Sequence, residues 1–176
     1  MATQLLPDQR LLRLGEALKG TVDTWKEGAD LVAKSGLSID NLCLAVARDR
    51  WYLARSHFRA AESFSRGPGH HYRAAVSRYY YAMYHAMRAA VFLDHGGDDF
   101  EAHAELPSRT PKILPNAAQW QNALKSAREH RNRADYDPYP RRASAWARVA
   151  TDLRQESADL LALTRRYLIA KGCRVR

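Results

Sequence analysis

Residues 71–94 read HYRAAVSRYYYAMYHAMRAAVFLD, and their apolar side chains recur with the period of an α-helix. Projected at about 100° per residue, the segment has one polar arc and a wide apolar sector on the opposite side. The polar arc consists of Arg73, Ser77, Arg78, His85 and Arg88. The apolar sector consists of Val76, Tyr80, Met83, Ala86, Met87 and Ala90. A sector this wide predicts a central helix with neighbours on several sides, because each apolar face must be covered by another element.

Glycine- and proline-containing segments divide the rest of the chain into stretches of helical length. These breaks lie at residues 36–38, 67–69, 96–97, 107–115 and 138–140. Besides the central helix, we predict a helix or helix pair over 8–34 and helices over 40–65, 117–135 and 141–171. No segment alternates apolar and polar residues over a length that indicates a strand. The sequence therefore predicts an all-α, up-and-down helical bundle over residues 39–176, preceded by an N-terminal helical extension over residues 1–38.

The formal net charge of +9 is concentrated toward the C-terminus. Residues 128–176 hold 12 Lys and Arg against 6 Asp and Glu, and 22 of the 28 cations in the chain are arginines. The planar guanidinium matches the geometry of phosphate oxygens, and an asymmetric basic surface is typical of proteins that bind nucleic acid. A solvated basic face without a ligand has the same composition, so charge alone leaves both interpretations open.

The sequence predicts a cytoplasmic protein that does not enter a membrane. Its N-terminus is amphipathic and lacks the charged-then-apolar order of a secretory signal, and no apolar run approaches the roughly 18 residues of a membrane span. Cys43 and Cys173 are isolated, which favours a reducing compartment. We expect neither a metal nor a cofactor, because His70, His71 and His103 lack the partners of a metal site and the chain has no glycine-rich phosphate loop.

The most unusual residue of the predicted helix 117–135 is Arg131. The apolar stripe of this helix consists of Trp120, Leu124, Ala127 and Ala134. Arg131 falls near the middle of that stripe, where a guanidinium must be paired or must emerge at a cleft or interface. We therefore expect Arg131 to be partly buried and hydrogen-bonded. Within the next one and a half turns follow Asn132, Arg133, Asp135 and Tyr136. This group predicts an anion-binding or catalytic cluster, and a structural salt bridge from Arg131 to a buried carboxylate is the alternative.

Two segments carry a resemblance to a known family. Residues 74–90, AAVSRYYYAMYHAMRAA, resemble the second helix of HEPN domains, where an A-x-x-R-x-Y-Y-A-x-[FY]-x-A-x-x-A run is typical. Residues 128–138, REHRNRADYDP, resemble the R-x-x-A-D-Y-D-P block of small single-domain bacterial HEPN proteins. The two motifs stand in the expected order, about 50 residues apart, and residues 51–65 resemble the first helix of the family. The resemblance covers roughly residues 45–170.

The resemblance implies a bundle that commonly dimerises and often acts as a metal-independent ribonuclease. In active members an R-[polar]-x-x-x-H motif supplies a histidine as general acid and base and an arginine that stabilises phosphate charge. Arg131 matches the arginine of this motif and Asn132 the polar residue, whereas Tyr136 occupies the histidine position. Phenols titrate near pH 10 in model compounds, so a tyrosine is a poor general base at neutral pH. Arg131, Asn132 and Tyr136 are thus the expected catalytic residues of a site that departs from the motif.

Two functions follow from the resemblance and stay open. The first is a HEPN protein with a degenerate ribonuclease motif that binds RNA or a partner protein, for instance a nucleotidyltransferase, in a toxin–antitoxin or phage-defence setting. The second is an active, metal-independent HEPN endoribonuclease that acts as a toxin. The loss of the motif histidine favours the first function, and the Arg-Asn pair with the basic C-terminal third supports the second.

Four arginines near the second motif are expected to contact nucleic acid: Arg128, Arg133, Arg141 and Arg142. Tyr139 and Trp146 lie beside them and could stack on unpaired bases, although Trp146 also fits the first core residue of the last helix. Residues 79–81, all tyrosine, are expected to pack in the core. The apolar sector of helix 71–94 exceeds what one small bundle obviously needs, which predicts a homodimer through this helix and helix 117–135.

Overall fold

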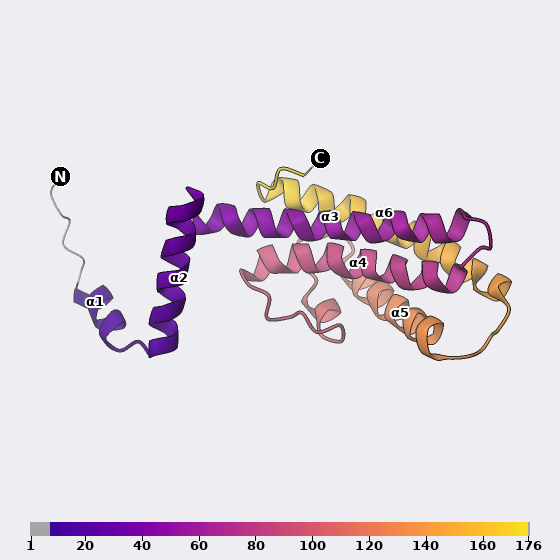
Figure 1. Ribbon diagram of the computed structural model, residues 1–176, viewed down its shortest axis with the longest axis horizontal. Coiled ribbons are helices and arrows are strands. Elements are labelled where there is room, and N and C mark those ends of the chain that lie inside the picture. The colour runs from indigo at the N-terminus through magenta and orange to yellow at the C-terminus, as the bar shows by residue number, and fades with distance from the viewer. Residues whose placement is uncertain (1–7, 176) are drawn as a thin grey trace. The chain divides into compact units, whose positions relative to one another are not determined.

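The computed structural model describes residues 8–175 and is all-α, with no strand in that range (Figure 1). Its helices are α1 (Asp8–Gly15), α2 (Lys19–Ser35), α3 (Ile39–Arg66), α4 (Tyr72–His95), α5 (Ala117–Tyr136) and α6 (Ala147–Ala170). Two short 3-10 helices, η1 (Leu106–Arg109) and η2 (Ala143–Trp146), precede α5 and α6. The predicted fold class is confirmed.

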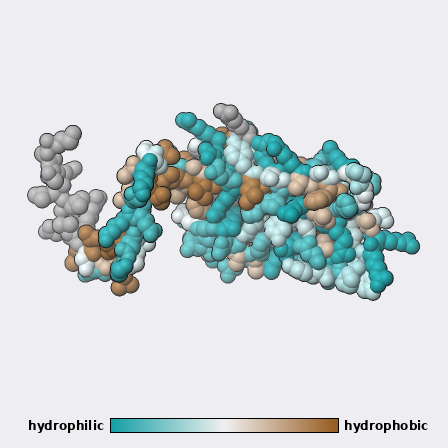
Figure 2. Space-filling view, viewed as in Figure 1, coloured by the Kyte–Doolittle hydropathy of each residue, from teal (hydrophilic) through white to brown (hydrophobic). Residues whose placement is uncertain are grey.

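The chain divides into two compact units, one formed by residues up to Leu42 and one by residues from Cys43 onward, and α3 runs across this boundary. In the first unit the predicted pair of helices forms α1 and α2, and no residue of α2 is buried. Apolar side chains remain exposed on these helices (Figure 2), among them Leu12, Leu14, Trp25 and Leu31. The first seven residues of the predicted N-terminal extension lie outside the described residues.

In the second unit α4 is the central helix, as its wide apolar sector predicted. Thirteen of its 24 residues are buried, and it packs against α5 and α6. On the side of α3, the Phe58 and Tyr79 rings meet edge-on with their centroids 5.6 Å apart. All six residues of the predicted apolar sector are buried within the chain. The sector from which we expected a dimer interface is therefore covered by the protein's own helices.

The helix boundaries follow the predicted breaks except at the start of α6. Gly36 and Gly96 end α2 and α4 in the left-handed conformation, and their N–H groups bond to Val32 and Phe92 carbonyls. The prediction that the last helix begins at residue 141 is wrong, because α6 begins at Ala147. The two prolines of residues 138–140 hold the chain extended, since a residue before proline avoids the helical conformation. Arg142 is still extended, and the chain enters α6 only through the 3-10 turn of η2.

Within the described residues, none of the helices combines the length and the apolar character needed to cross a bilayer.

Candidate functional site

The C-terminal end of α5 is fixed against the first turns of α4 by Arg73. The last carbonyl groups of a helix have no partner within the helix and carry partial negative charge. Arg73 Nε donates to the carbonyl of Ala134 at 2.9 Å, and Arg73 Nη2 donates to the carbonyl of Asp137. The guanidinium of Arg73 also lies 5.0 Å from the ring of Trp146. One arginine of the α4 polar arc thus sets the position of the whole second sequence motif.

Arg131 projects from α5 toward the polar arc of α4, and its side chain is only 17% exposed. Its Nη2 donates a hydrogen bond to the Tyr81 hydroxyl, and its Nη1 donates to Asn132 Oδ1 at 2.9 Å. Its Nε lies 3.1 Å from Asp135 Oδ2. The prediction that Arg131 is partly buried and hydrogen-bonded is confirmed, and the carboxylate nearest to its Nε belongs to its own chain.

The pairing of Arg131 is incomplete. Although Nε lies within ion-pair distance of Asp135, it is a buried atom without an aligned hydrogen-bond acceptor in the described part of the chain. The distance gives a Coulombic contact, and the missing alignment means that the full hydrogen bond is not made. Burial opposes the charge of Arg131, but the hydrogen bond that it donates to Tyr81 and the nearby Asp135 carboxylate raise its pKa above the usual value. The guanidinium therefore stays charged and only partly neutralised.

Ser77 and Asp135 join the two helices beside Arg131. The Ser77 hydroxyl donates to Asp135 Oδ1, and the other carboxylate oxygen faces Arg131. Ser77 belongs to the predicted polar arc of α4, and the structure shows that this arc faces the end of α5. Buried polar groups require partners. Here the polar arc of α4 and the Arg131 cluster supply hydrogen-bond partners to each other.

The three residues expected to be catalytic lie together. Asn132 is half-buried next to Arg131, and the Tyr136 ring lies 5.7 Å from the Arg131 guanidinium. Tyr136 is 72% exposed, so its phenol is in contact with solvent at the edge of the cluster.

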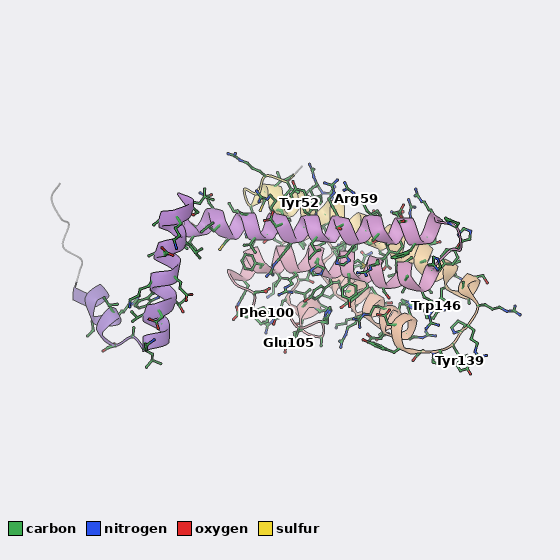
Figure 3. The ribbon with its side chains drawn as sticks, viewed as in Figure 1. Tyr52, Arg59, Phe100, Glu105, Tyr139 and Trp146 are labelled. Atoms are coloured by element: carbon green, nitrogen blue, oxygen red, sulfur yellow. The ribbon has the colours of Figure 1, made fainter. Side chains whose placement is uncertain are left out.

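The other predicted residues are more dispersed. Arg128 is half-buried on α5, one turn before Arg131, whereas Arg133, Arg141 and Arg142 are exposed. Trp146 is 3% exposed, and its indole N–H donates to the Pro140 carbonyl, so it is a core residue and not a stacking platform. Tyr139 is exposed in the connection between α5 and α6 (Figure 3), where the Arg141 guanidinium lies 5.3 Å from its ring.

A groove of about 480 Å³ opens beside this cluster, and sequence analysis did not identify it. It is lined by His57 and Phe64 of α3, by Ala74, Ser77, Arg78, Tyr81 and His85 of α4, and by Asp135 of α5. Three of these residues stood on the predicted polar arc of α4, which was the available signal. Tyr81 was assigned to the core as part of a tyrosine run, yet it is only partly buried and its hydroxyl binds Arg131. Nothing in the sequence indicated that His57 of another helix lies here.

The two histidines of the groove are held in the neutral form. Their rings stack with centroids 5.2 Å apart and an interplanar angle of 4°. Burial, followed by the positive charge of Arg78, lowers the pKa of His57. Burial, followed by His57 and Arg88, lowers the pKa of His85 to about 4. At neutral pH the groove thus presents uncharged imidazoles close to a charged guanidinium.

The other end of α4 carries a second polar cluster, which is closed. Both terminal nitrogens of Arg50 donate to the Asp98 carboxylate, and Arg88 donates to the same two oxygens. The hydrogen bonds from Arg50 and then Arg88 hold the pKa of Asp98 well below its usual range. Arg88 also donates to Glu101, so that two carboxylates balance two guanidinium groups.

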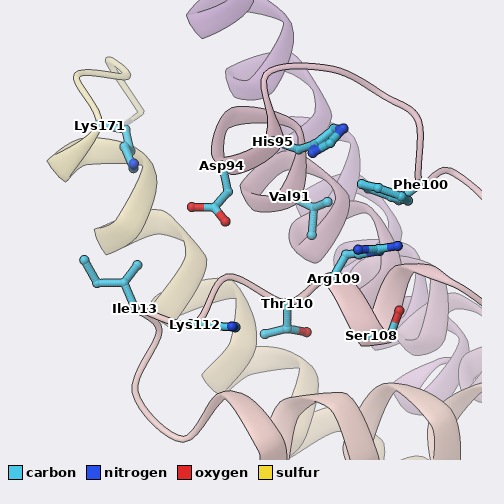
Figure 4. A pocket seen from close by; sticks show the side chains of 10 residues that line it. All are labelled: Val91, Asp94, His95, Phe100, Ser108, Arg109, Thr110, Lys112, Ile113 and Lys171. Carbon is cyan, nitrogen blue, oxygen red and sulfur yellow. The ribbon is translucent and has the colours of Figure 1, made fainter.

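A second pocket of about 480 Å³ lies near this closed cluster, between the end of α4, the segment before α5 and the end of α6 (Figure 4). Arg109, Lys112 and Lys171 line it with positive charge, but all three are exposed. The guanidinium of Arg109 lies over the Phe100 ring at 4.0 Å, and Asp94 accepts a hydrogen bond from Tyr167 at 3.0 Å. Arg109 and Asp94 therefore already have partners within the chain, and the groove beside Arg131 is the stronger candidate site.

No set of three or more histidine, cysteine, aspartate or glutamate side chains within residues 8–175 is placed to hold a metal ion.

The comparisons with known proteins identify one family. A family model described as HEPN domain matches residues 47–167, a range that contains the Arg131 cluster and the groove. No curated protein and no solved structure matches the chain.

Proposed function

The chain belongs to the HEPN domain family, and from this membership we propose that it binds RNA through a surface centred on Arg131. The family is linked to RNA binding and to nuclease and toxin roles. One observation carries the proposal: a half-buried, charged guanidinium beside a groove has donors that the protein leaves unused. Arginine has five N–H donors, and two of them make the hydrogen bonds of Arg131 within the described residues.

A phosphate oxygen would be a suitable acceptor for the remaining N–H groups on the two terminal nitrogens of Arg131, because Nε itself is buried. Charge-assisted hydrogen bonds are stronger than neutral ones, and they gain further where solvent is partly excluded. Asp135 competes for the same guanidinium but accepts from Ser77 with its other oxygen. Ser77 of α4 therefore shares the Asp135 carboxylate with Arg131, which keeps Arg131 oriented without neutralising it completely.

The four arginines predicted to contact nucleic acid extend the proposed surface. Arg128 is half-buried one turn before Arg131 on α5, and Arg133, Arg141 and Arg142 are exposed. Exposed cations add affinity through counterion release, with little dependence on RNA sequence. Tyr139, exposed beside Arg141, supplies an aromatic face for an unpaired base.

A metal-independent endoribonuclease is the second candidate function, and a specific observation favours it. Tyr136 stands where active members carry histidine, but the groove next to Arg131 contains two neutral histidines from α3 and α4. Neutral imidazole is the form that accepts a proton from a hydroxyl. The groove thus supplies imidazoles although the motif position holds a tyrosine.

For the biological setting, we propose a cytoplasmic protein of a toxin–antitoxin or phage-defence system, with a nucleotidyltransferase or another protein as a possible partner.

A homodimer that brought two Arg131 side chains to one cleft would double the positive charge offered to RNA. The apolar sector of α4 is buried, so such a dimer has to use exposed residues such as Tyr136 and Arg133. Sedimentation of wild type at tens of micromolar tests this arrangement.

RNA binding by matched variants tests the proposed function. Labelled single-stranded RNA is titrated with wild type, Arg131→Ala and Arg166→Ala at low salt, with chelator present to exclude metal nucleases. Arg166 is an exposed cation of α6 and serves as the control. We expect Arg131→Ala to weaken binding by about tenfold, the value of one charge-assisted hydrogen bond of about 1.4 kcal/mol, and Arg166→Ala by less than about twofold. Equal losses in the two variants, or no RNA binding by wild type, would contradict the proposal.

A further inference from the structure

His57 of α3 and Arg131 of α5 contact the same tyrosine from different helices. The Tyr81 hydroxyl accepts a hydrogen bond from Arg131, and the centroid of the Tyr81 ring lies 5.5 Å from that of His57. The His85 ring stacks on the His57 ring, with the two centroids 5.2 Å apart, and its centroid lies 6.4 Å from that of the Tyr81 ring. Tyr81 therefore links the Arg131 guanidinium to an imidazole that is not part of the sequence motif.

The hydrogen-bond partner of His57 defines which of its nitrogens can accept a proton. Arg78 Nη1 lies 3.4 Å from His57 Nδ1. A guanidinium only donates, so Nδ1 is the accepting nitrogen and Nε2 carries the ring proton of the neutral form. Arg78 is exposed and lines the groove. When Arg78 turns to an RNA phosphate, His57 Nδ1 is released as a proton acceptor.

Burial and the surrounding cations favour the neutral form of both histidines in the free protein. The cations that act on the two imidazoles are Arg50, Arg78 and Arg88, with His103 as a further neighbour of His85, and Asp135 is the carboxylate that lines the groove. Burial is the main cause that lowers the pKa of each histidine in the free protein, and the neighbouring cations lower it further. A bound phosphate adds negative charge and raises the proton affinity of the imidazoles. Substrate binding and proton acceptance are thus coupled.

We propose that His57 is the proton-transfer residue of an RNA-cleaving site in this groove, with His85 as the residue that positions its ring. The inference rests on the proposed RNA-binding function and gives it a reaction. His57 Nδ1 accepts the proton of a ribose 2′-hydroxyl while the bond between O2′ and phosphorus forms. The bond between phosphorus and O5′ then breaks, and the imidazolium returns the proton to the leaving oxygen. Arg131 and Arg78 stabilise the negative charge that develops on the phosphate.

This step is balanced without a co-reactant. The products are a 2′,3′-cyclic phosphate and a 5′-hydroxyl, and the histidine returns to its neutral form. The groove volume of about 480 Å³ is within the range of sites that enclose one small ligand. Phe64 and Tyr81 line it with aromatic rings. The substrate class is therefore single-stranded RNA, in which one nucleotide can leave its stack and enter the groove.

The experiment measures cleavage and binding separately. Single-stranded RNA is incubated with wild type, His57→Asn, His57→Gln and the control His95→Asn in the presence of chelator, and the product ends are identified. Binding is measured with the same RNA carrying 2′-O-methyl groups, which cannot be cleaved by this reaction. His95 lies in the last turn of α4, with 44% of its side chain exposed, and takes no part in the groove.

We expect wild type to leave 2′,3′-cyclic phosphate ends and either His57 variant to lower the rate by about 100-fold or more. Both variants should bind the 2′-O-methyl RNA within about threefold of wild type, and His95→Asn should change neither quantity. His85→Ala should lower the rate by about tenfold, while His85→Phe, which keeps a flat ring against His57, should restore most of it. Wild-type cleavage should also decline at acidic pH as His57 becomes protonated, and this acidic decline should be lost with His57.

Three outcomes would overturn the inference. Wild type that binds the 2′-O-methyl RNA but does not cleave unmodified RNA would leave RNA binding intact and remove the reaction. Cleavage by both His57 variants at the wild-type rate would show that another group transfers the proton. Absence of binding to either RNA would remove the proposed function itself, which separates that failure from the other two. Thermal unfolding of each variant identifies a loss caused by misfolding, and two different substitutions at residue 57 guard against it.

Discussion

The two ends of α4 use the same residue types and differ in how completely the charges are paired. At the C-terminal end, Asp98 is bound by both Arg50 and Arg88, and Glu101 balances the second positive charge. At the N-terminal end, Asp135 is shared between a serine hydroxyl and one arginine whose Nε is not aligned with it. In the first cluster two carboxylates balance two guanidinium groups, whereas in the second the buried Nε of Arg131 has no aligned acceptor within the described residues and a groove lies beside the cluster. Incomplete pairing, and not the presence of arginine, marks the candidate site.

The largest expected effect of this difference is on stability. Asp98→Asn leaves two partly buried guanidinium groups without their carboxylate, and we expect the free energy of unfolding to fall by about 2–3 kcal/mol, below the range for fully buried pairs because Asp98 is partly exposed. Asp135→Asn should lower it by about 1 kcal/mol or less, since Arg131 keeps Tyr81 and Asn132. Urea denaturation at pH 7 measures both. Equal losses would mean that the two clusters have the same structural role.

The contribution of Asp98 to the free energy of unfolding should depend on pH. Because the folded pKa of Asp98 is lowered, its contribution is present above the unfolded value near pH 4 and is lost as the pH falls further. In Asp98→Asn, the difference in stability from wild type should therefore shrink as the pH is lowered from about 5 to 2.

The contribution of His85, at the groove end of α4, to stability should change with pH in a higher window than that of Asp98. The folded pKa of His85 is about 4, below the unfolded value near 6.5, so the unfolded chain binds the proton more tightly. Neutral His85 contributes stability above about pH 6.5, and this contribution is lost as the pH falls toward 4. We expect His85→Phe to reduce the acid-induced loss of stability in this window by on the order of 1–2 kcal/mol. Denaturation curves at several pH values from 4 to 7.5 test this expectation, with His95→Asn as the control. A pH dependence of stability that is unchanged in His85→Phe would contradict the burial of this imidazole.

The fold was predictable because helix formation depends on local periodicity and on breaking residues. The apolar sector of residues 71–94 predicted a central helix, and that helix is α4. The start of α6 was not predictable from composition, because residues 141–146 have ordinary helix-forming side chains and only the preceding prolines and the Trp146–Pro140 contact keep them out of the helix. Helix starts depend on such specific partners more than helix interiors do.

Only those features of the site that lie within one helix were predictable from the sequence. Arg131 could be identified because a charge on an apolar stripe is unusual within one helix. Its partner Tyr81 lies 50 residues away, and Ser77 lies 58 residues from its partner Asp135. Periodicity within a helix says nothing about which arc of another helix it meets. His57 is further removed still, because it reaches the site from α3 through contacts with Tyr81 and His85.

The smallest expected effect concerns the motif position itself. Tyr136 is exposed and does not line the groove, so Tyr136→His should change the RNA cleavage rate by less than about threefold if His57 transfers the proton. The measurement is the initial rate of cleavage beside wild type, with Tyr139→His as a control at another exposed tyrosine. A rise of more than tenfold would show that the motif position, and not the groove, is where an imidazole acts.

The salt dependence of RNA binding tests most directly the claim that Arg131 contacts a phosphate. Affinity for single-stranded RNA is measured from about 50 to 200 mM salt for wild type, Arg131→Ala and Arg166→Ala. Each phosphate contact contributes about 0.7 to the slope of log affinity against log salt for a single strand. The account predicts that Arg131→Ala reduces the steepness by about this amount and that Arg166→Ala leaves it nearly unchanged. Parallel lines for wild type and Arg131→Ala would show that Arg131 supports the fold without touching RNA, and would contradict the proposed site.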